Sequence, residues 1–170
     1  MPPPAKPVLL YIDADACPVK EQVYKVAERY GLKVFVVANA HMQVPRTGWI
    51  ERVVVPAGPD IADDWIAERA GPGDVVITAD IPLASRCLKN GAAVIGTTGK
   101  EFTQASIGLV LATRNLMQNL RETGEITGGP PPFSGRDRSA FLSTLDQVVT
   151  RWKRAGYGGQ ALFTPPAIHS

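Results

Sequence analysis

The sequence predicts an α/β fold: a three-layer domain with a central, mostly parallel sheet of about five strands that is flanked by helices. Short apolar runs alternate along the chain with segments whose apolar residues recur at helical spacing. This pattern is typical of parallel strands joined by right-handed crossovers. The runs are also continuously apolar rather than alternating, as expected of strands that are buried on both faces of a sheet.

The front of the chain provides the strands and three of the helices. The strands are expected within 7–12, 33–38, 52–56, 71–80 (where a turn comes first) and 92–96. The helices between them are expected over 19–30, 60–70 and 82–90. Gly31 and Gly91 directly follow the first and third of these helices, and glycine favours the left-handed backbone that commonly ends a helix.

The chain changes character after residue 100. Residues 101–122 are rich in apolar side chains and predict a long helix, and 123–135 (TGEITGGPPPFSG) indicate a connector rich in Gly and Pro. A further helix is expected over 136–154, because its apolar residues recur on one face. The expected organisation is a single domain over 1–154, with 101–154 as its C-terminal helical part, and a loose tail over 155–170.

The composition is that of an ordinary globular protein. The 170 residues suit one domain with a real core, and the net charge of +2 argues neither for nor against a nucleic-acid partner. Cys17 and Cys87 are isolated, so the sequence suggests neither a zinc knuckle nor a disulfide framework. The start of the sequence lacks a signal-peptide core, and no apolar run is long enough to span a membrane. We therefore expect a cytoplasmic protein without membrane association.

Acidic residues follow several of the expected strands at the point where each strand ends. They are Asp13 and Asp15 after the first strand, Asp60, Asp63 and Asp64 after the third, and Asp80 after the fourth. Ligands of open parallel sheets bind at the carboxyl ends of the strands. We therefore expect these carboxylates to gather at one edge of the sheet.

Helix capping is the alternative explanation for some of these acids. Asp15, Asp60 and Asp80 each precede an expected helix, where an aspartate accepts hydrogen bonds from free backbone N–H groups. Asp13 continues a buried strand and lies too early in the chain for an obvious cap, so function is the better explanation there.

A divalent cation would explain why carboxylates that repel one another are placed together. Carboxylates without a neighbouring His or Cys select hard cations such as Mg²⁺ or Mn²⁺. Such ions lower the pKa of bound water and clamp phosphate oxygens. The pattern therefore predicts a Mg²⁺ or Mn²⁺ site at the acidic edge.

Four stretches resemble motifs of the uncharacterised YaiI/YqxD family. They are YIDADACPVK (11–20), PDIADDWI (59–66), DVVITADIPLA (74–84) and GGPPPFSGRDRSAF (128–141). The resemblance extends over residues 8–152. The family is grouped by similarity with PIN-like domains, a fold of metal-dependent nucleases, so the resemblance implies a PIN-like fold.

The resemblance also implies roles for individual acids. Asp13, Asp63 and Asp80 would be the catalytic and metal-binding acids of a PIN-like site. Asp15 and Asp60 match motifs of the narrower family and complete the expected metal ligands. The glutamate that many PIN nucleases carry on a middle helix has no clear counterpart in this chain, which bears on catalysis more than on fold.

Four polar residues are expected to contact the substrate. Thr78 is implied by the resemblance as the polar companion of Asp80, and Asn39 follows the second strand, within reach of the acidic edge. Arg136 and Arg138 begin the last helix and present planar donors suited to phosphate. A structural hinge with surface ion pairs is the alternative role for the two arginines.

Three functions are compatible with these patterns. The first is a metal-dependent nuclease that hydrolyses phosphodiester bonds, with RNA favoured over DNA as its substrate. The second is a non-catalytic PIN-like module that binds RNA, a nucleotide or a protein. The third and least favoured is a phosphatase in which the D-x-D motif at 13–15 supplies an aspartyl nucleophile and a general acid.

Overall fold

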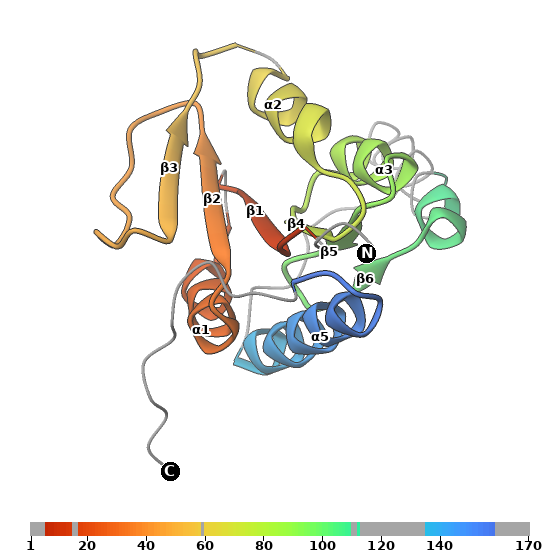
Figure 1. Cartoon of the computed structure of the whole chain (residues 1–170). Coiled ribbons are helices and arrows are strands. Elements are labelled where there is room, and N and C mark those ends of the chain that lie inside the picture. The colour runs from red at the N-terminus through yellow and green to blue at the C-terminus, as the bar shows by residue number, and fades with distance from the viewer. Residues whose placement is uncertain (1–5, 15–16, 59, 110–111, 113–134, 159–170) are drawn as a thin grey trace.

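A six-stranded sheet with the strand order β3-β2-β1-β4-β5-β6 forms the centre of the protein (Figure 1). The computed structural model describes residues 6–14, 17–58, 60–109, 112 and 135–158. The strands are β1 (Leu9–Asp13), β2 (Lys33–Ala38), β3 (Ile50–Val54), β4 (Asp74–Ile77), β5 (Ala93–Ile95) and β6 (Glu101–Phe102). Strands β1 to β5 run parallel and β6 pairs antiparallel with β5. The predicted mostly parallel α/β sheet is confirmed, with β6 as an additional edge strand.

Helices cover both faces of the sheet and give the fold three layers. They are α1 (Lys20–Tyr30), α2 (Ile61–Arg69), α3 (Ile81–Lys89) and α5 (Gly135–Arg154). Figure 1 shows α1 and α5 on one face of the sheet and α2 and α3 on the other.

Each face of the sheet buries its own apolar cluster. Leu10 and Ile12 of β1 pack on the side of α1 and α5, where Phe141 is fully buried. Val76 of β4 packs on the side of α2 and α3, where Ile66 is fully buried. Successive strand residues point to opposite faces, so two covered faces require the continuously apolar strands that the sequence contains.

Strand β6 corrects the prediction for the segment after residue 100. A helix is expected over 101–122, but this segment begins with β6, and its described helical residues include 104–109. A tight turn causes the change: Gly99 has a φ of 91°, which glycine adopts without steric cost, and Phe102 is thereby buried against the sheet. Most of 110–134, including nearly all of the expected connector, lies outside the described residues.

The end of the described chain packs against the domain. The expected last helix is confirmed as α5, one residue longer at its start. Residues 155–158 begin the segment expected to be loose, yet the ring of Tyr157 lies 5.0 Å from that of Trp152. The Gly158 N–H donates to the Lys6 carbonyl over 2.9 Å. Residues 159–170 lie outside the described part of the chain.

Candidate functional site

The candidate site lies where the sheet reverses its winding, between β1 and β4. From β1 the chain adds β2 and β3 on one side, and it then returns to place β4, β5 and β6 on the other. Ligands of open α/β sheets bind at such a switch point, outside the carboxyl ends of the strands. Ile12 is in register with Ile77, so Asp13 and Thr78 leave the sheet side by side.

A buried hydroxyl links the two strand ends. The Thr78 side chain donates to Asp13 Oδ2 over 2.8 Å and accepts from the Asp80 backbone N–H over 2.9 Å. Thr78 is only 1% exposed. Its hydroxyl therefore orients Asp13, and its burial disfavours the direct substrate contact that the sequence predicts for it.

Asp80 begins α3 as a helix cap. Its Oδ1 accepts from the Leu83 backbone N–H over 2.8 Å, which satisfies one of the free donors of the first helical turn. The capping role anticipated for Asp80 is confirmed. A carboxylate has two oxygens, so capping by one of them still allows Asp80 to line a pocket.

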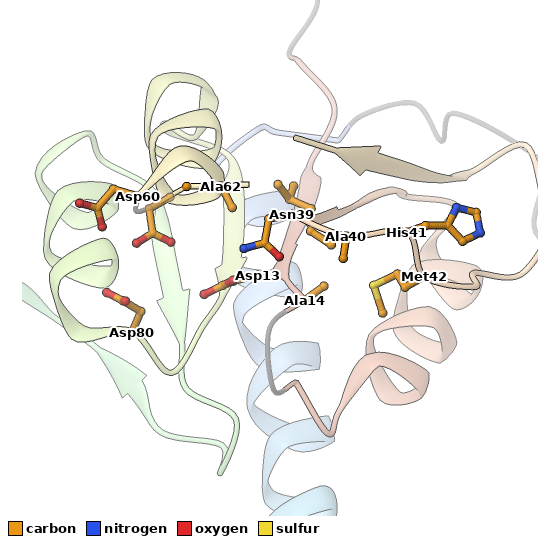
Figure 2. A pocket seen from close by; sticks show the side chains of 13 residues that line it. Asp13, Ala14, Asn39, Ala40, His41, Met42, Asp60, Ala62 and Asp80 are labelled. Atoms are coloured by element: carbon orange, nitrogen blue, oxygen red, sulfur yellow. The ribbon is translucent and has the colours of Figure 1, made fainter. Parts of the chain in front are cut away.

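A pocket of about 440 Å³ opens at this edge, a size that suits a small ligand or a single nucleotide. Its wall contains four of the five acids predicted to bind metal, Asp13, Asp60, Asp63 and Asp80, together with Asn39. Figure 2 shows the Asp60 and Asp80 carboxylates toward one end, Asp13 and Asn39 in the middle, and Met42 and His41 toward the other end. The predicted gathering of acids at one sheet edge thus takes place.

The remaining predicted site residues lie elsewhere. Asp15, the second acid of the D-x-D motif at 13–15, falls outside the described residues. Arg136 and Arg138 are exposed at the start of α5 and do not line the acidic pocket. Arg138 lines a different pocket with Cys17 and Lys20.

The acids in the pocket interact electrostatically. The pKa of Asp63 is raised from 3.8 to about 6 by desolvation and by the negative charges of Asp80, Asp13 and Asp60. Arg86, whose guanidinium pairs with Asp64 at 2.7 Å, lowers the pKa of Asp63 and is the smallest of these influences. The raised pKa of Asp63 therefore reflects its burial and repulsion among the carboxylates of the pocket.

These carboxylates are not arranged as a closed metal cage. Across the described residues, no group of three or more His, Cys, Asp or Glu side chains is placed so that it could hold a metal ion. The pocket therefore offers oxygen donors without a preformed multidentate site.

Asp60 lies at the start of α2 in a left-handed conformation. Its φ is 63°, which is uncommon for a residue other than glycine, and its side chain makes no capping hydrogen bond. The alternative that Asp60 caps this helix is therefore wrong. Its carboxylate lines the acidic pocket instead.

Sequence reasoning placed Asn39 at the site but missed that the segment around it, between β2 and β3, forms a wall of the pocket. Residues 37–42 form one wall of the pocket, and Met42 is among its lining residues. The available signal was the lack of helical spacing over 39–49, which leaves the crossover between two parallel strands without a helix.

The fold and the pocket define an α/β protein with a carboxylate-lined site at its switch point. The chain belongs to the YaiI/YqxD family, described as uncharacterised, whose model matches residues 11–151. The resemblance noted from the sequence is thereby confirmed.

The relatives cover nearly the same length. The UPF0178 protein of Azorhizobium caulinodans is 64% identical over 152 residues, 89% of this chain and 96% of the relative. The UPF0178 protein of Nitrobacter winogradskyi is 62% identical over 148 residues, 87% of this chain and 94% of the relative. No solved structure matches the chain significantly, and the PIN-like grouping stays a prediction.

None of the helices in the described residues has the length and apolarity that a membrane crossing requires.

Proposed function

We propose that this protein is a divalent-metal-dependent nuclease that hydrolyses phosphodiester bonds, with RNA favoured over DNA. One observation carries the proposal: Asp13, Asp60, Asp63 and Asp80 come from three separate chain segments and line a single pocket at the switch point. Capping explains only Asp80. A cation would relieve the repulsion between these carboxylates, and carboxylates favour a hard cation.

The donor set fits Mg²⁺ or Mn²⁺ better than a softer metal. The pocket offers the four carboxylates and the Asn39 amide oxygen, whereas the imidazole of His41 lies within 3.2 Å of Arg52. Mg²⁺ keeps several waters and is often held by one or two carboxylates together with substrate phosphates. This mode of binding is compatible with the lack of three closely placed ligands among the described residues. We therefore expect weak metal binding that substrate strengthens.

The residues of the pocket divide the chemistry between them. Hydrolysis joins a water oxygen to phosphorus, breaks one P–O ester bond, and yields a phosphomonoester and an alcohol. Asp63, whose pKa of about 6 lies near neutrality, is suited to take the proton from water and return it to the leaving oxygen. Asp13, oriented by Thr78, and Asp80 would hold the cation, which supplies charge neutralisation at the phosphate oxygens.

Strand cleavage tests the proposal directly. The full chain is incubated with end-labelled single-stranded RNA or DNA of one sequence, in Mn²⁺, Mg²⁺ or EDTA. We expect cleavage only with metal, faster for RNA, and a loss of about a hundredfold or more for Asp13→Asn. The matched control is Asp64→Asn, because Asp64 neighbours Asp63 on α2 but does not line the pocket. Cleavage that persists in EDTA, or that Asp13→Asn leaves intact, would contradict the proposal.

A non-catalytic binding module is the second candidate. The observation in its favour is that no preformed metal site exists in the part of the chain that the structure describes. It predicts that labelled RNA binds to the wild-type protein but stays intact in Mn²⁺. Hydrolysis of nitrophenyl phosphate by a protein that leaves RNA intact would instead support the phosphatase.

A further inference from the structure

The connection between β2 and β3 is unusual for two parallel strands. Residues 39–49 lead from the carboxyl end of β2 back to the start of β3, and none of them is helical. Parallel neighbours are ordinarily joined by a crossover that contains a helix. The β3 side of the sheet is therefore bordered by an extended segment, which leaves room for a groove.

This crossover segment is firmly attached to the domain. Met42, Val44 and Trp49 pack against the core on the side of α1 and α5. The Arg52 guanidinium donates to the Met42 carbonyl over 3.0 Å and lies 3.2 Å from His41 Nε2. The segment is therefore anchored at several points along its length, and the residues between these anchors, 43 and 45–48, are exposed.

The outward side chains form a basic groove that adjoins the acidic pocket. The groove has a volume of about 670 Å³, and its charged or ionisable residues are Lys33, His41, Arg46, Glu51 and Arg52. His41 lines both the groove and the acidic pocket. In Figure 2, His41 and Met42 lie toward the end of the pocket opposite Asp60 and Asp80. The pocket and the groove are thus neighbouring sites with opposite charge.

Arg46 is the cation of the groove that is available to a ligand. Lys33 pairs with Glu51 at 3.4 Å, and Arg52 anchors Met42. Arg46 is exposed and, within the described residues, makes no ion pair or hydrogen bond. A guanidinium with free donors matches the geometry of phosphate oxygens.

We infer that this basic groove binds the phosphodiester backbone of a single-stranded nucleic acid whose neighbouring nucleotide occupies the acidic pocket. The inference rests on the proposed function, which supplies the reason for a phosphate in the pocket. Opposite charges at adjoining sites suit such a strand, because the cation at the reacting phosphate and Arg46 at a neighbouring phosphate each neutralise one negative charge. Backbone contacts of this kind position a strand without reading its sequence.

Binding without cleavage provides the test. Fluorescent oligouridylates of two and eight nucleotides are titrated with the full chain in Ca²⁺, a hard cation that carboxylate oxygens also bind and that keeps a positive charge in the acidic pocket. The anisotropy is followed at several salt concentrations, and gel electrophoresis confirms that the strands stay intact. We expect Arg46→Ala to reduce the slope of log affinity against log salt for the eight-nucleotide strand by about 0.7, the value of one phosphate contact in a single strand. If the two proteins bind equally at about 1 M salt, this difference in slope corresponds to roughly an eightfold loss of affinity at about 50 mM salt. The two-nucleotide strand is too short to extend far from the pocket into the groove, so Arg46→Ala should reduce its affinity much less.

The control variant is Arg154→Ala, which removes an exposed arginine at the end of α5 that lines neither the pocket nor the groove. It should leave the slope unchanged. Oligodeoxyuridylates form the second arm of the experiment. Arg46→Ala should lower the affinity for RNA and DNA strands equally, because both have phosphates in their backbone. A loss confined to one sugar, or an equal loss for Arg154→Ala, would overturn the backbone contact.

The outcomes separate this inference from the proposed function. If wild type cleaves RNA with Mn²⁺ while Arg46→Ala binds the eight-nucleotide strand normally, the groove inference is overturned and the nuclease proposal is supported. If Arg46→Ala lowers the affinity as expected while the wild-type protein cleaves neither RNA nor DNA, the groove inference is supported and the nuclease proposal fails. If wild type binds neither length of strand, the groove inference is overturned.

Discussion

A single carboxylate can combine a structural role with a place in the pocket. Asp80 caps α3 with Oδ1, and it also lines the acidic pocket. Asp13 is oriented by the Thr78 hydroxyl, which the Asp80 backbone N–H fixes in turn. Capping and ligand binding, which look like alternatives in the sequence, are therefore compatible. The same hydrogen bonds stabilise the strand ends and set the direction of the pocket oxygens.

We expect the charge of Asp63 to destabilise the fold above acidic pH. Burial and neighbouring carboxylates raise the pKa of Asp63 from 3.8 to about 6, so the folded chain holds this proton more tightly than the unfolded chain. The resulting stability is fully present below the unfolded pKa and is lost as the pH rises through the folded pKa. Asp63→Asn should therefore be more stable than wild type near pH 8 and similar to it near pH 4, as measured by urea unfolding.

The control for this prediction is Asp64→Asn on the same helix. The Asp64 side chain is exposed and paired with Arg86, so its removal should not raise stability at either pH. A stabilisation by Asp63→Asn that is equally large near pH 4 would show that improved packing, rather than relieved repulsion, is responsible. Added Mg²⁺ should narrow the difference at high pH, because a bound cation offsets the same repulsion.

At the scale of elements, α2 and α3 begin in different ways although each starts with an aspartate. Asp80 has an extended backbone and caps α3 with its side chain, whereas Asp60 is left-handed with a φ of 63° and makes no cap bond. Local sequence favours a cap at both positions. The left-handed backbone at residue 60 has no signature in the local sequence, so sequence reasoning assigns Asp80 correctly and Asp60 wrongly.

Asp60→Gly should therefore leave stability unchanged or raise it by up to about 1 kcal/mol, since glycine adopts the left-handed conformation without the steric cost that other residues pay. Asp80→Ala should instead cost about 1 kcal/mol, the typical value of a lost cap. Both variants remove one negative charge from the pocket, so their difference in urea unfolding reports the local backbone and cap. A loss of about 1 kcal/mol for Asp60→Gly would show that its carboxylate stabilises α2 after all.

The elements that could be predicted are those with an apolar pattern of their own. The strand at 33–38 is found with the predicted bounds, and α5 differs by one residue. The third strand, expected at 52–56, spans Ile50–Val54, because pairing with β2 rather than apolarity alone sets where it begins. β6 was missed because a turn at Gly99, and not a strand pattern, brings Phe102 to the sheet.

The candidate site could be predicted only as far as topology determines it. Parallel strands bring their carboxyl ends to one edge, so the acids after β1, β3 and β4 gather in a single pocket. The distances between their oxygens depend on side-chain directions and on the backbone at Asp60, which no spacing rule supplies. A search for motifs likewise could not find the helix-free crossover from β2 to β3. The crossover contributes the shape of the pocket wall and exposed side chains, and neither follows from a sequence motif.

At the scale of the whole molecule, the two ends of the described chain are tied to the amino edge of the sheet, away from the pocket. Lys6 Nζ donates to Asp74 Oδ1 at 2.5 Å, and Asp74, at the start of β4, is 1% exposed. The Trp152 indole N–H donates to the Asp74 carbonyl over 3.0 Å, and Gly158 donates to the Lys6 carbonyl. Asp74 thus binds the chain before β1 through its buried carboxylate, and it binds the end of α5 through its backbone carbonyl.

Removing the cation from this cluster should destabilise the entire domain. Lys6→Met leaves Asp74 buried without its charge partner, and we expect a loss of about 2 kcal/mol near pH 8, less than a fully buried pair would lose because the Lys6 side chain is 40% exposed. Burial already raises the pKa of Asp74, and the loss of Lys6 should raise that pKa further. Asp74 in the variant therefore takes up a proton as the pH falls, and the difference from wild type should shrink toward pH 4.

Urea unfolding of two further variants separates charge from packing in this prediction. Lys6→Met combined with Asp74→Asn should recover much of the lost stability, because the neutral amide needs no charge partner. Lys89→Met, at an exposed lysine that ends α3, should have little effect at any pH. The ion pair would be excluded as the cause if Lys6→Met costs the same near pH 4 as near pH 8 and the double variant recovers nothing. The interaction of Lys6 Nζ with the Tyr157 ring, whose centroid lies 5.9 Å away, would then be what holds the chain ends to the sheet.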